Sequence, residues 1–199
     1  MEWERLFEDL EDQLASGWEA ERAALDAESE RLRIARLDLR TRLSALVREP
    51  TPIAATMTDG ATVTGRPRAV GADWIALEPA ESRVVVLLPL GAVALWTLDH
   101  GALLASGGPS EPLSPLRERM TLGFVLRDLA RRRAGVSLRV RPGTILTGTI
   151  DRAGADHLDL ALHDAGEPRR THAVRGFRIV PFSALISVTT GIASTGRLG

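Results

Sequence analysis

Two histidines and an aspartate in the stretch HLDLALH are the residues of this chain whose types could bind a metal ion. On a β-strand, His157, Asp159 and His163 would share the face opposite Leu158 and Leu160. Neutral imidazoles and a carboxylate are ligands that zinc and other transition metals accept. However, roughly 20 Å of extended strand would separate the two histidines, so one ion could not bind both without a bend. We therefore predict an ordinary solvated face here, with no metal and no other cofactor.

Arginine supplies all of the chain's basic side chains: all 25 are Arg and none is Lys. The densest groups lie at the end of a predicted helix, on the strand after it, and in and after a loop insertion. Guanidinium groups bind phosphate, although no aromatic side chain is interleaved with the first group to stack on bases. Phosphate binding, helix capping with solubility, and pairing with the acidic N-terminal segment stay open as interpretations. The residues predicted to bind nucleic acid are Arg131, Arg132, Arg133, Arg139, Arg141, Arg169, Arg170 and Arg175.

The chain carries none of the sequence motifs that mark common enzymes. It has no recognisable Ser-His-Asp motif, phosphate loop or Gly-rich dinucleotide fingerprint. It also has no Cys, which removes disulfides, thiolate catalysis and Cys-based zinc sites together. We therefore expect no enzymatic activity.

The net charge of −1 conceals a strong asymmetry along the chain. Residues 1–28 hold ten acidic residues and two arginines, a net charge of −8, whereas residues 114–199 hold seven acidic residues and 14 arginines, a net charge of +7. An acidic head and a basic tail can pair with each other, within one chain or between chains. The basic tail could also bind an acidic partner.

No apolar run approaches the roughly 20 residues that span a bilayer. The N-terminal stretch MEWERLFEDLEDQL is acidic, whereas a secretory signal begins basic and then turns apolar. We therefore expect a cytoplasmic protein with no membrane partner.

The first 48 residues predict a helix, because they contain no Pro, a single Gly, and many Glu, Ala, Leu and Arg residues. Unbroken, this helix would be roughly 70 Å long, so a small domain could not cover its apolar stripe. A coiled coil between protomers, or a helical hairpin broken at Gly17, would supply the missing partner. We favour self-association into a homo-oligomer, through Trp3, Phe7, Leu10, Leu14, Leu25, Leu32, Leu39 and Leu43.

From Ile53 onward the apolar period changes from helical to alternating, which predicts short β-strands. Five strands are expected up to residue 99, and a second set of five follows a helix that begins near Ser114. The predicted organisation is a helical segment at 1–48, a first barrel at 50–99, a linker at 100–113, a helix with a second barrel at 114–190, and a flexible tail at 191–199.

The two sets of predicted strands repeat each other in sequence. Sliding residues 60–77 onto 143–160 gives seven identities in 18 positions without a gap, including the Gly-Ala-Asp triplets at 71–73 and 154–156. The closing stretches LLPLGAVALWT and IVPFSALISVT align in turn, and the extra residues of the second copy fall in one loop. The sequence therefore predicts an internal duplication.

Several positions of the repeat carry a likeness to a known fold. They are Gly65 and Gly148 within the second strand, Asp73 and Asp156 at the start of the third, and the closing FRIVPFSALISV. This pattern resembles the Sm-like fold of the Sm, LSm and Hfq proteins. The resemblance implies an α+β protein with two duplicated, strongly bent five-stranded Sm-like (SH3-like) barrels. It also implies single-stranded RNA as a ligand.

The expected function is that of a non-enzymatic binding module, an RNA- or DNA-binding adaptor that uses the Arg-rich face of the second barrel. The alternative is a protein-interaction scaffold that self-associates through its N-terminal helix and recruits partner proteins.

Overall fold

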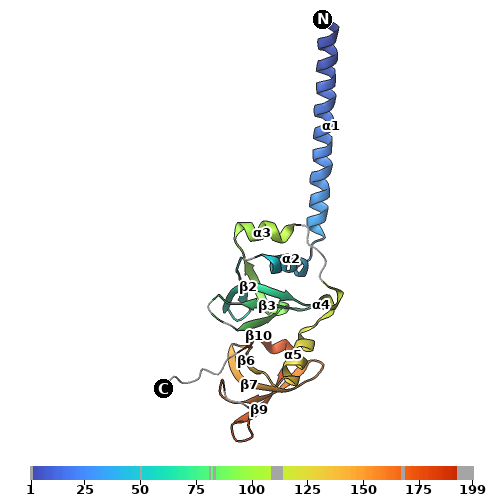
Figure 1. Ribbon diagram of the computed structural model, residues 1–199. Helices are drawn as coiled ribbons and strands as arrows, with labels where there is room; N and C mark the ends of the chain where they lie inside the picture. The colour runs from blue at the N-terminus through green and yellow to red at the C-terminus, as the bar shows by residue number, and fades with distance from the viewer. Residues whose placement is uncertain are drawn as a thin grey trace. The chain divides into compact units, whose positions relative to one another are not determined.

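The computed structural model describes residues 2–49, 51–80, 82, 84–108, 114–166 and 169–191. The chain divides into two compact units, an N-terminal unit of residues 1–39 and a sheet unit of residues 40–199. Figure 1 labels the helices and strands of both. Among the described residues, no helix is long and apolar enough to cross a membrane.

The N-terminal unit consists mainly of one long helix, α1, which spans Glu2–Ala35. It passes through Gly17 without a break, so the helical-hairpin alternative is wrong. A single Gly costs a helix only about 1 kcal/mol relative to Ala, and the many Glu, Ala, Leu and Arg residues around it have high helix propensity. Ion pairs between residues three apart, Glu28–Arg31 and Glu30–Arg33, add to the last turns.

The predicted helix over 1–48 is not continuous at its C-terminal end. A turn follows α1, and α2 (Leu39–Ala45) and a 3₁₀ turn (Leu46–Arg48) come after it. Leu43 and Leu46 are buried in a core of the sheet unit. The assignment of Leu43 to self-association is therefore wrong, because this side chain already packs within its own chain.

The described part of the sheet unit contains ten strands. They are β1 Ile53–Met57, β2 Thr62–Val70, β3 Trp74–Glu78, β4 Val85–Pro89, β5 Val93–Thr97, β6 Gly135–Val140, β7 Thr144–Ala153, β8 His157–Leu162, β9 Gly176–Pro181 and β10 Leu185–Thr190. The order across the sheet is β5-β1-β2-β3-β4-β10-β6-β7-β8-β9, and all neighbours are antiparallel. A 3₁₀ turn joins β4 to β5 at Leu90–Ala92, and another joins β9 to β10 at Phe182–Ala184.

The prediction of two separate five-stranded Sm-like barrels is wrong. The strands form one continuous ten-stranded sheet, because β4 of the first set pairs with β10 of the second. Leu87 lies opposite Val188 in this pair, and Val86 lies opposite Thr189. β4 is apolar along nearly its whole length, so it is stable only where both of its faces are covered. The two hydrophobic cores cover these faces, with Leu88 in one core and Leu87 in the other. The predicted mixture of helices and antiparallel strands is present.

Two hydrophobic cores share the central strands. The first core contains Ile75 and Leu77 of β3, whereas the second contains Trp74 and Ala76 of the same strand. β3 is therefore buried on both faces. β10 is divided in the same way, with Ile186 in the first core and Val188 in the second.

The segment predicted as a linker at 100–113 begins with a helix instead. α3 spans His100–Gly107, and the Asp99 side chain accepts a hydrogen bond from the Ala102 N–H at 2.7 Å. Ser106 is buried and accepts a hydrogen bond from Arg42 at 2.8 Å. The Gly and Ser content that favoured a linker was misleading, because this cap and these contacts decide the local structure. Residues 109–113, and 192–199 of the predicted tail, lie outside the described residues.

Gly65 and Gly148 lie where the neighbouring strand leaves no space for a side chain. A Cβ at Gly148 would lie 2.0 Å from the backbone oxygen of Ala161 on β8, and one at Gly65 would lie 2.8 Å from the carbonyl of Glu78 on β3. Backbone atoms cannot move aside as a flexible side chain can. The two glycines are therefore required by the close approach of the adjacent strand.

Gly148→Ala is expected to lower the free energy of unfolding by about 1–3 kcal/mol, because the added methyl group overlaps a backbone carbonyl. Urea unfolding measures the change. Gly135→Ala is the matched control, since a Cβ there would meet nothing within 4 Å. Equal unfolding midpoints for the two variants would contradict the close-approach explanation.

Candidate functional site

The two Gly-Ala-Asp turns have the same backbone geometry. The Gly71 N–H donates to the carbonyl of Trp74 at 2.9 Å, and the Gly154 N–H donates to the carbonyl of His157 at 2.8 Å. In each turn the Asp carbonyl also accepts a backbone N–H from the corner that follows the fourth strand of its set, at 2.9 and 2.7 Å. The ring of Trp74 or His157 covers its glycine so closely that an added Cβ would collide with it. The turns therefore have a structural role.

The first turn also holds the helix that precedes β6. This helix, α5, spans Leu122–Arg131 and follows a short helix, α4, at Pro115–Arg119. The Asp73 carboxylate accepts the Leu122 N–H at 2.7 Å, at the N-terminus of α5. The Trp74 indole N–H donates to the carbonyl of Met120 at 2.9 Å. Both side chains are thus used in joining the two halves of the sheet unit.

In the second turn the contact with α5 is different: the Gly154 carbonyl accepts a hydrogen bond from the Arg127 side chain at 3.1 Å. Its Asp156 carboxylate lies 2.8 Å from Nδ1 of His157, and both side chains are exposed. The hydrogen bond from His157 lowers the pKa of Asp156.

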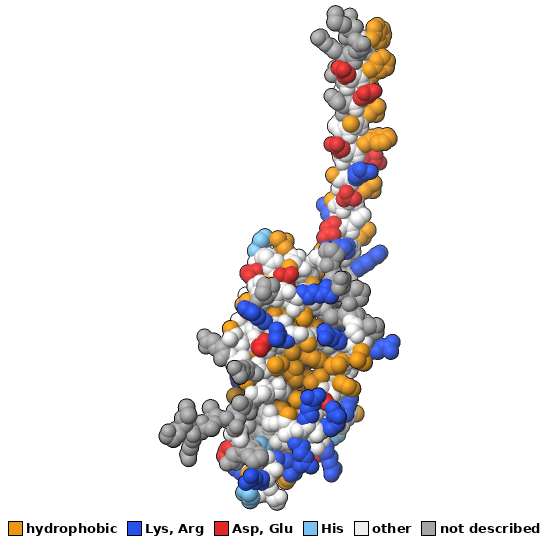
Figure 2. All heavy atoms as spheres, viewed as in Figure 1, with side chains coloured by type: hydrophobic (Ala, Val, Ile, Leu, Met, Phe, Trp, Pro, Cys, Tyr) orange, Lys and Arg blue, Asp and Glu red, His pale blue; other side chains and the backbone are white. Residues whose placement is uncertain are grey.

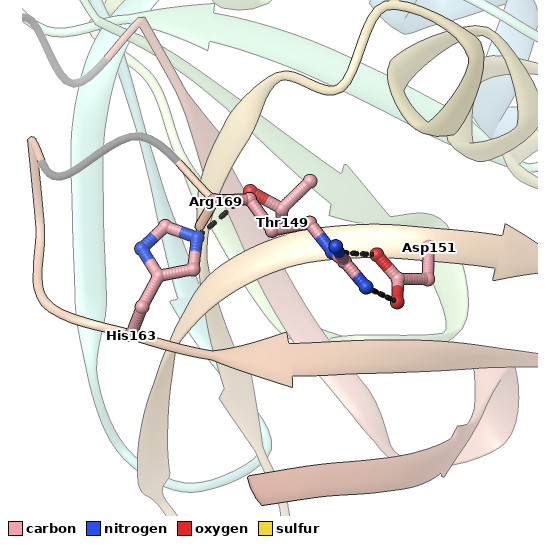
Figure 3. Close-up of polar contacts among 4 residues, drawn as sticks. All are labelled: Thr149, Asp151, His163 and Arg169. Carbon is pink, nitrogen blue, oxygen red and sulfur yellow. Dashed lines mark hydrogen bonds and ion pairs between the residues drawn. The ribbon is translucent and has the colours of Figure 1, made fainter. Parts of the chain in front are cut away.

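The three residues considered as metal ligands are not brought together. His157 lies on the surface at the start of β8, whereas His163 lies just after β8 and is buried. Its Nδ1 lies 3.0 Å from the carbonyl of Asp164, so Nδ1 carries the proton and donates. In the neutral ring, Nε2 then accepts the hydroxyl of Thr149 at 2.8 Å (Figure 3). Among the described residues, no three His, Asp or Glu side chains are placed to hold a metal ion.

The loop between β8 and β9 is fixed to β7 by two side chains. Besides His163, Arg169 reaches β7 and donates two hydrogen bonds to Asp151, at 2.5 and 2.6 Å (Figure 3). This ion pair is about three-quarters buried, and Asp151 raises the pKa of Arg169. Arg169 therefore stabilises the loop and does not present a bare positive charge to a ligand.

Most of the predicted nucleic-acid-binding arginines have a carboxylate partner. Arg131 and Arg132 both pair with Asp128 on α5. The pKa of Asp128 is lowered, first by its hydrogen bond with Arg131. Arg175 pairs with Asp164 at 2.6 Å. These pairs reduce the positive potential that the sequence predicted for this surface.

Arg139 of β6 forms an ion pair that joins the two halves of the sheet unit. Its Nε donates to Oδ2 of Asp59 at 2.6 Å. Asp59 lies in the turn between β1 and β2, and its side chain is only 5% exposed. The hydrogen bond from Arg139, followed by one from the Ala61 N–H, lowers the pKa of Asp59. Arg139 is therefore a structural residue of the β1–β2 turn and β6.

Three of the predicted arginines have no carboxylate partner among the described residues: Arg133, Arg141 and Arg170. All three side chains are exposed. Arg133 follows α5 with a φ of 50°, and Arg141 precedes Pro142 at the turn after β6. Figure 2 shows arginine side chains over the sheet unit. Of the eight arginines predicted to bind nucleic acid, these three therefore have side chains that could still contact a phosphate.

The apolar residues predicted for self-association form an exposed row on α1, apart from Leu39 and Leu43, which belong to α2. Figure 2 shows hydrophobic side chains along one side of α1 with acidic side chains beside them. Trp18, which the predicted set omits, is the most exposed of the row at 75%. Trp18 lies four residues after Leu14 and seven residues before Leu25, and this helical spacing would have placed it in the predicted set. The α1 row consists of Trp3, Phe7, Leu10, Leu14, Trp18, Leu25 and Leu32.

Comparison with protein-family models, with curated proteins and with solved structures finds no match. The resemblance of the repeat to Sm-like sequences is therefore neither supported nor opposed by relatives.

Arg139→Gln is expected to destabilise the sheet unit near pH 7, because it leaves the nearly buried Asp59 carboxylate without its cation. In the native protein the pKa of Asp59 lies below its ordinary value of 3.8. Its contribution is therefore complete above that value and is lost as the pH falls through the lowered pKa. The difference between wild type and variant, measured as urea midpoints from pH 7 to pH 2.5, should shrink over that acid range.

Arg175→Gln is the matched control, because its ion pair with Asp164 is exposed and such pairs contribute little to stability. It should leave the unfolding midpoint nearly unchanged at every pH. A loss for Arg175→Gln as large as that for Arg139→Gln would contradict the structural role of the Asp59–Arg139 pair.

Proposed function

We propose that this chain is a non-enzymatic, self-associating scaffold, in which α1 mediates homo-oligomerisation and the sheet unit recruits partner proteins. The observation that carries the proposal is the α1 row, seven large apolar side chains that are each 46–75% exposed on a helix of 34 residues. The cytoplasmic location expected from the sequence accompanies this proposal as a prediction.

The exposure of the α1 row is costly for a single chain in water. Burying apolar surface stabilises by about 25 cal/mol per Å², and large exposed apolar patches usually mark interaction sites. Intrinsic propensity alone gives most helices little stability, which comes instead from packing of an apolar face. A second copy of α1 would supply that packing along the whole row.

The sheet unit offers an open edge for partner proteins. In the described part of the chain, β9 pairs with β8 alone and leaves its other edge unpaired. Phe177 and Ile179 on this strand are 59% and 75% exposed. An exposed edge strand with apolar side chains can accept an extended segment of another protein as an added strand.

The two halves of the sheet unit support the proposal of an internal duplication. The strand orders β5-β1-β2-β3-β4 and β10-β6-β7-β8-β9 correspond strand by strand. The Gly-Ala-Asp turns and their backbone hydrogen bonds correspond as well. We propose that a five-stranded unit was duplicated and that its copies then fused into one sheet.

Nucleic-acid binding is the second candidate function. It is favoured by the exposed arginines that have no carboxylate partner among the described residues, Arg133, Arg141 and Arg170. It is weakened by the ion pairs of the other predicted arginines. We therefore rank it after the scaffold.

Leu14→Glu combined with Leu25→Glu is expected to raise the dissociation constant of the oligomer by about 100-fold or more, because each change would bury a carboxylate in the interface. Wild type should have at least twice the monomer mass by light scattering at tens of micromolar, and the variant the monomer mass. Ala23→Glu combined with Ala27→Glu adds the same charges off the row and should leave the mass unchanged. A monomeric wild type would contradict the scaffold proposal.

The second candidate predicts binding of single-stranded RNA or DNA at low ionic strength, with an affinity that falls steeply as salt rises. Arg133→Glu combined with Arg170→Glu should then weaken binding by about tenfold or more in a fluorescence anisotropy titration. Arg117→Glu, outside the predicted set, is the control. Absence of binding at low ionic strength would contradict the nucleic-acid function and leave the scaffold proposal unaffected.

A further inference from the structure

The α1 row keeps to one side of the helix along its whole length. Trp3, Leu14 and Leu25 are spaced by eleven residues, and so are Phe7 and Trp18. At about 100° per residue the row occupies an arc of about 80°. An eleven-residue period drifts by only about 20° in three turns, in the direction opposite to the seven-residue period of a left-handed coiled coil. Two copies of α1 can therefore meet along their full length.

Two glutamates interrupt the row, and they bear on its orientation. Glu21 and Glu28 fall within the same arc of α1. In a parallel, in-register pair each glutamate would face its own copy in the contact between the helices. Like charges placed opposite each other oppose association, most strongly where water is excluded.

The charges of α1 are also distributed unequally along its length. Residues 2–16 hold six acidic residues and one Arg, a net charge of −5, whereas residues 18–35 hold five acidic residues and three Arg, a net charge of −2. A parallel pair would place the two most acidic halves side by side. An antiparallel pair places each acidic half against the half that contains most of the arginines, so the repulsion is smaller.

The charged residues along one flank of the row are complementary between two copies of α1 that run in opposite directions. Glu11, Arg22 and Arg33 are spaced by eleven residues and lie beside the row on the same side. In an antiparallel pair the same flank of each helix meets its copy, so Glu11 approaches Arg22 of the other helix. Among the described residues, neither Glu11 nor Arg22 has an ion-pair partner within its own chain.

We infer that two copies of α1 pair antiparallel, with the two-fold axis between Gly17 and Trp18. This inference rests on the self-association proposed above. Reversing the row about this point brings Trp3 level with Leu32 of the second copy, and Leu10 level with its Leu25. The two copies of Trp18 then lie about 1.5 Å apart along the axis and on the same flank, so the two indoles meet at the two-fold axis.

The surface of α1 has a hollow that suits this register. Trp18, Glu21, Arg22 and Leu25 are four of the residues that line it. Their spacing, i, i+3, i+4 and i+7, is that of a hole that receives one side chain of a facing helix. In the antiparallel register Leu14 of the second copy lies level with this hole. Glu21 then meets an apolar side chain, and no longer meets its own copy.

The orientation can be tested by disulfide cross-linking in the full-length chain, which has no Cys of its own. Leu10→Cys and Leu25→Cys are made as separate variants, mixed in equal amounts, allowed to exchange subunits and oxidised. The antiparallel register brings the two positions together across the pair, within the roughly 4.4–6.8 Å between Cα atoms that a disulfide needs. We expect the mixture to form a disulfide between the two variants, identified by mass spectrometry, several-fold more than either variant alone.

The outcomes separate this inference from the scaffold proposal. A wild type that stays monomeric by light scattering overturns both. An oligomer in which each variant cross-links to itself is parallel, because an antiparallel pair holds the two copies of residue 10 about 22 Å apart along the axis. That result, or an oligomer that forms no cross-link in the mixture, overturns the antiparallel register while the scaffold proposal stands.

A charge exchange gives a second, independent measurement. Glu11→Arg and Arg22→Glu, each alone, should raise the dissociation constant by roughly tenfold, since each places like charges across both equivalent contacts. The combined variant should restore the wild-type value, because positions 11 and 22 of the two copies then carry opposite charges again, with their signs exchanged. In a parallel pair these positions do not meet, so combined changes that fail to restore association would overturn the register.

Discussion

The pairing of β4 with β10 is the contact on which the rest of the sheet unit depends. It joins two sets of five strands into one sheet and places β3, β4 and β10 between two hydrophobic cores. Ile75 and Trp74, neighbours on β3, pack in different cores. Because each core uses strands from both sets, neither set of strands can bury its apolar residues alone, and we expect the sheet unit to unfold as one.

Polar contacts between the two halves reinforce this arrangement. The Asp73 carboxylate meets the start of α5, and Arg139 meets Asp59 in the β1–β2 turn. Each contact satisfies a charged or backbone group at the junction that would otherwise lose its hydrogen bonds to water. The arginines that looked like a ligand surface in the sequence are therefore largely engaged in holding the molecule together.

Periodicity in the sequence predicted the local elements well, including most of the long helix and the two sets of five strands. It failed where long-range packing decides the outcome. The continuous apolar run of β4 indicates a buried strand but does not say whether β10 is its neighbour, so two barrels and one sheet have the same sequence pattern. Similarly, counting arginines cannot reveal that Asp128 or Asp151 lies beside them. For the α1 row the sequence was sufficient, since a single helix determines which residues share a face.

The two Gly-Ala-Asp turns show how one backbone arrangement can carry two different side-chain contacts. The first turn offers its Asp carboxylate to the helix that leads into the next set. The second has the same backbone, but a histidine replaces the tryptophan, and the Asp156 carboxylate is engaged by His157 beside it. The Trp-to-His difference therefore separates two roles of one turn: Trp74 connects the first copy to the chain that leads into the second, and His157 makes a contact with its own neighbour.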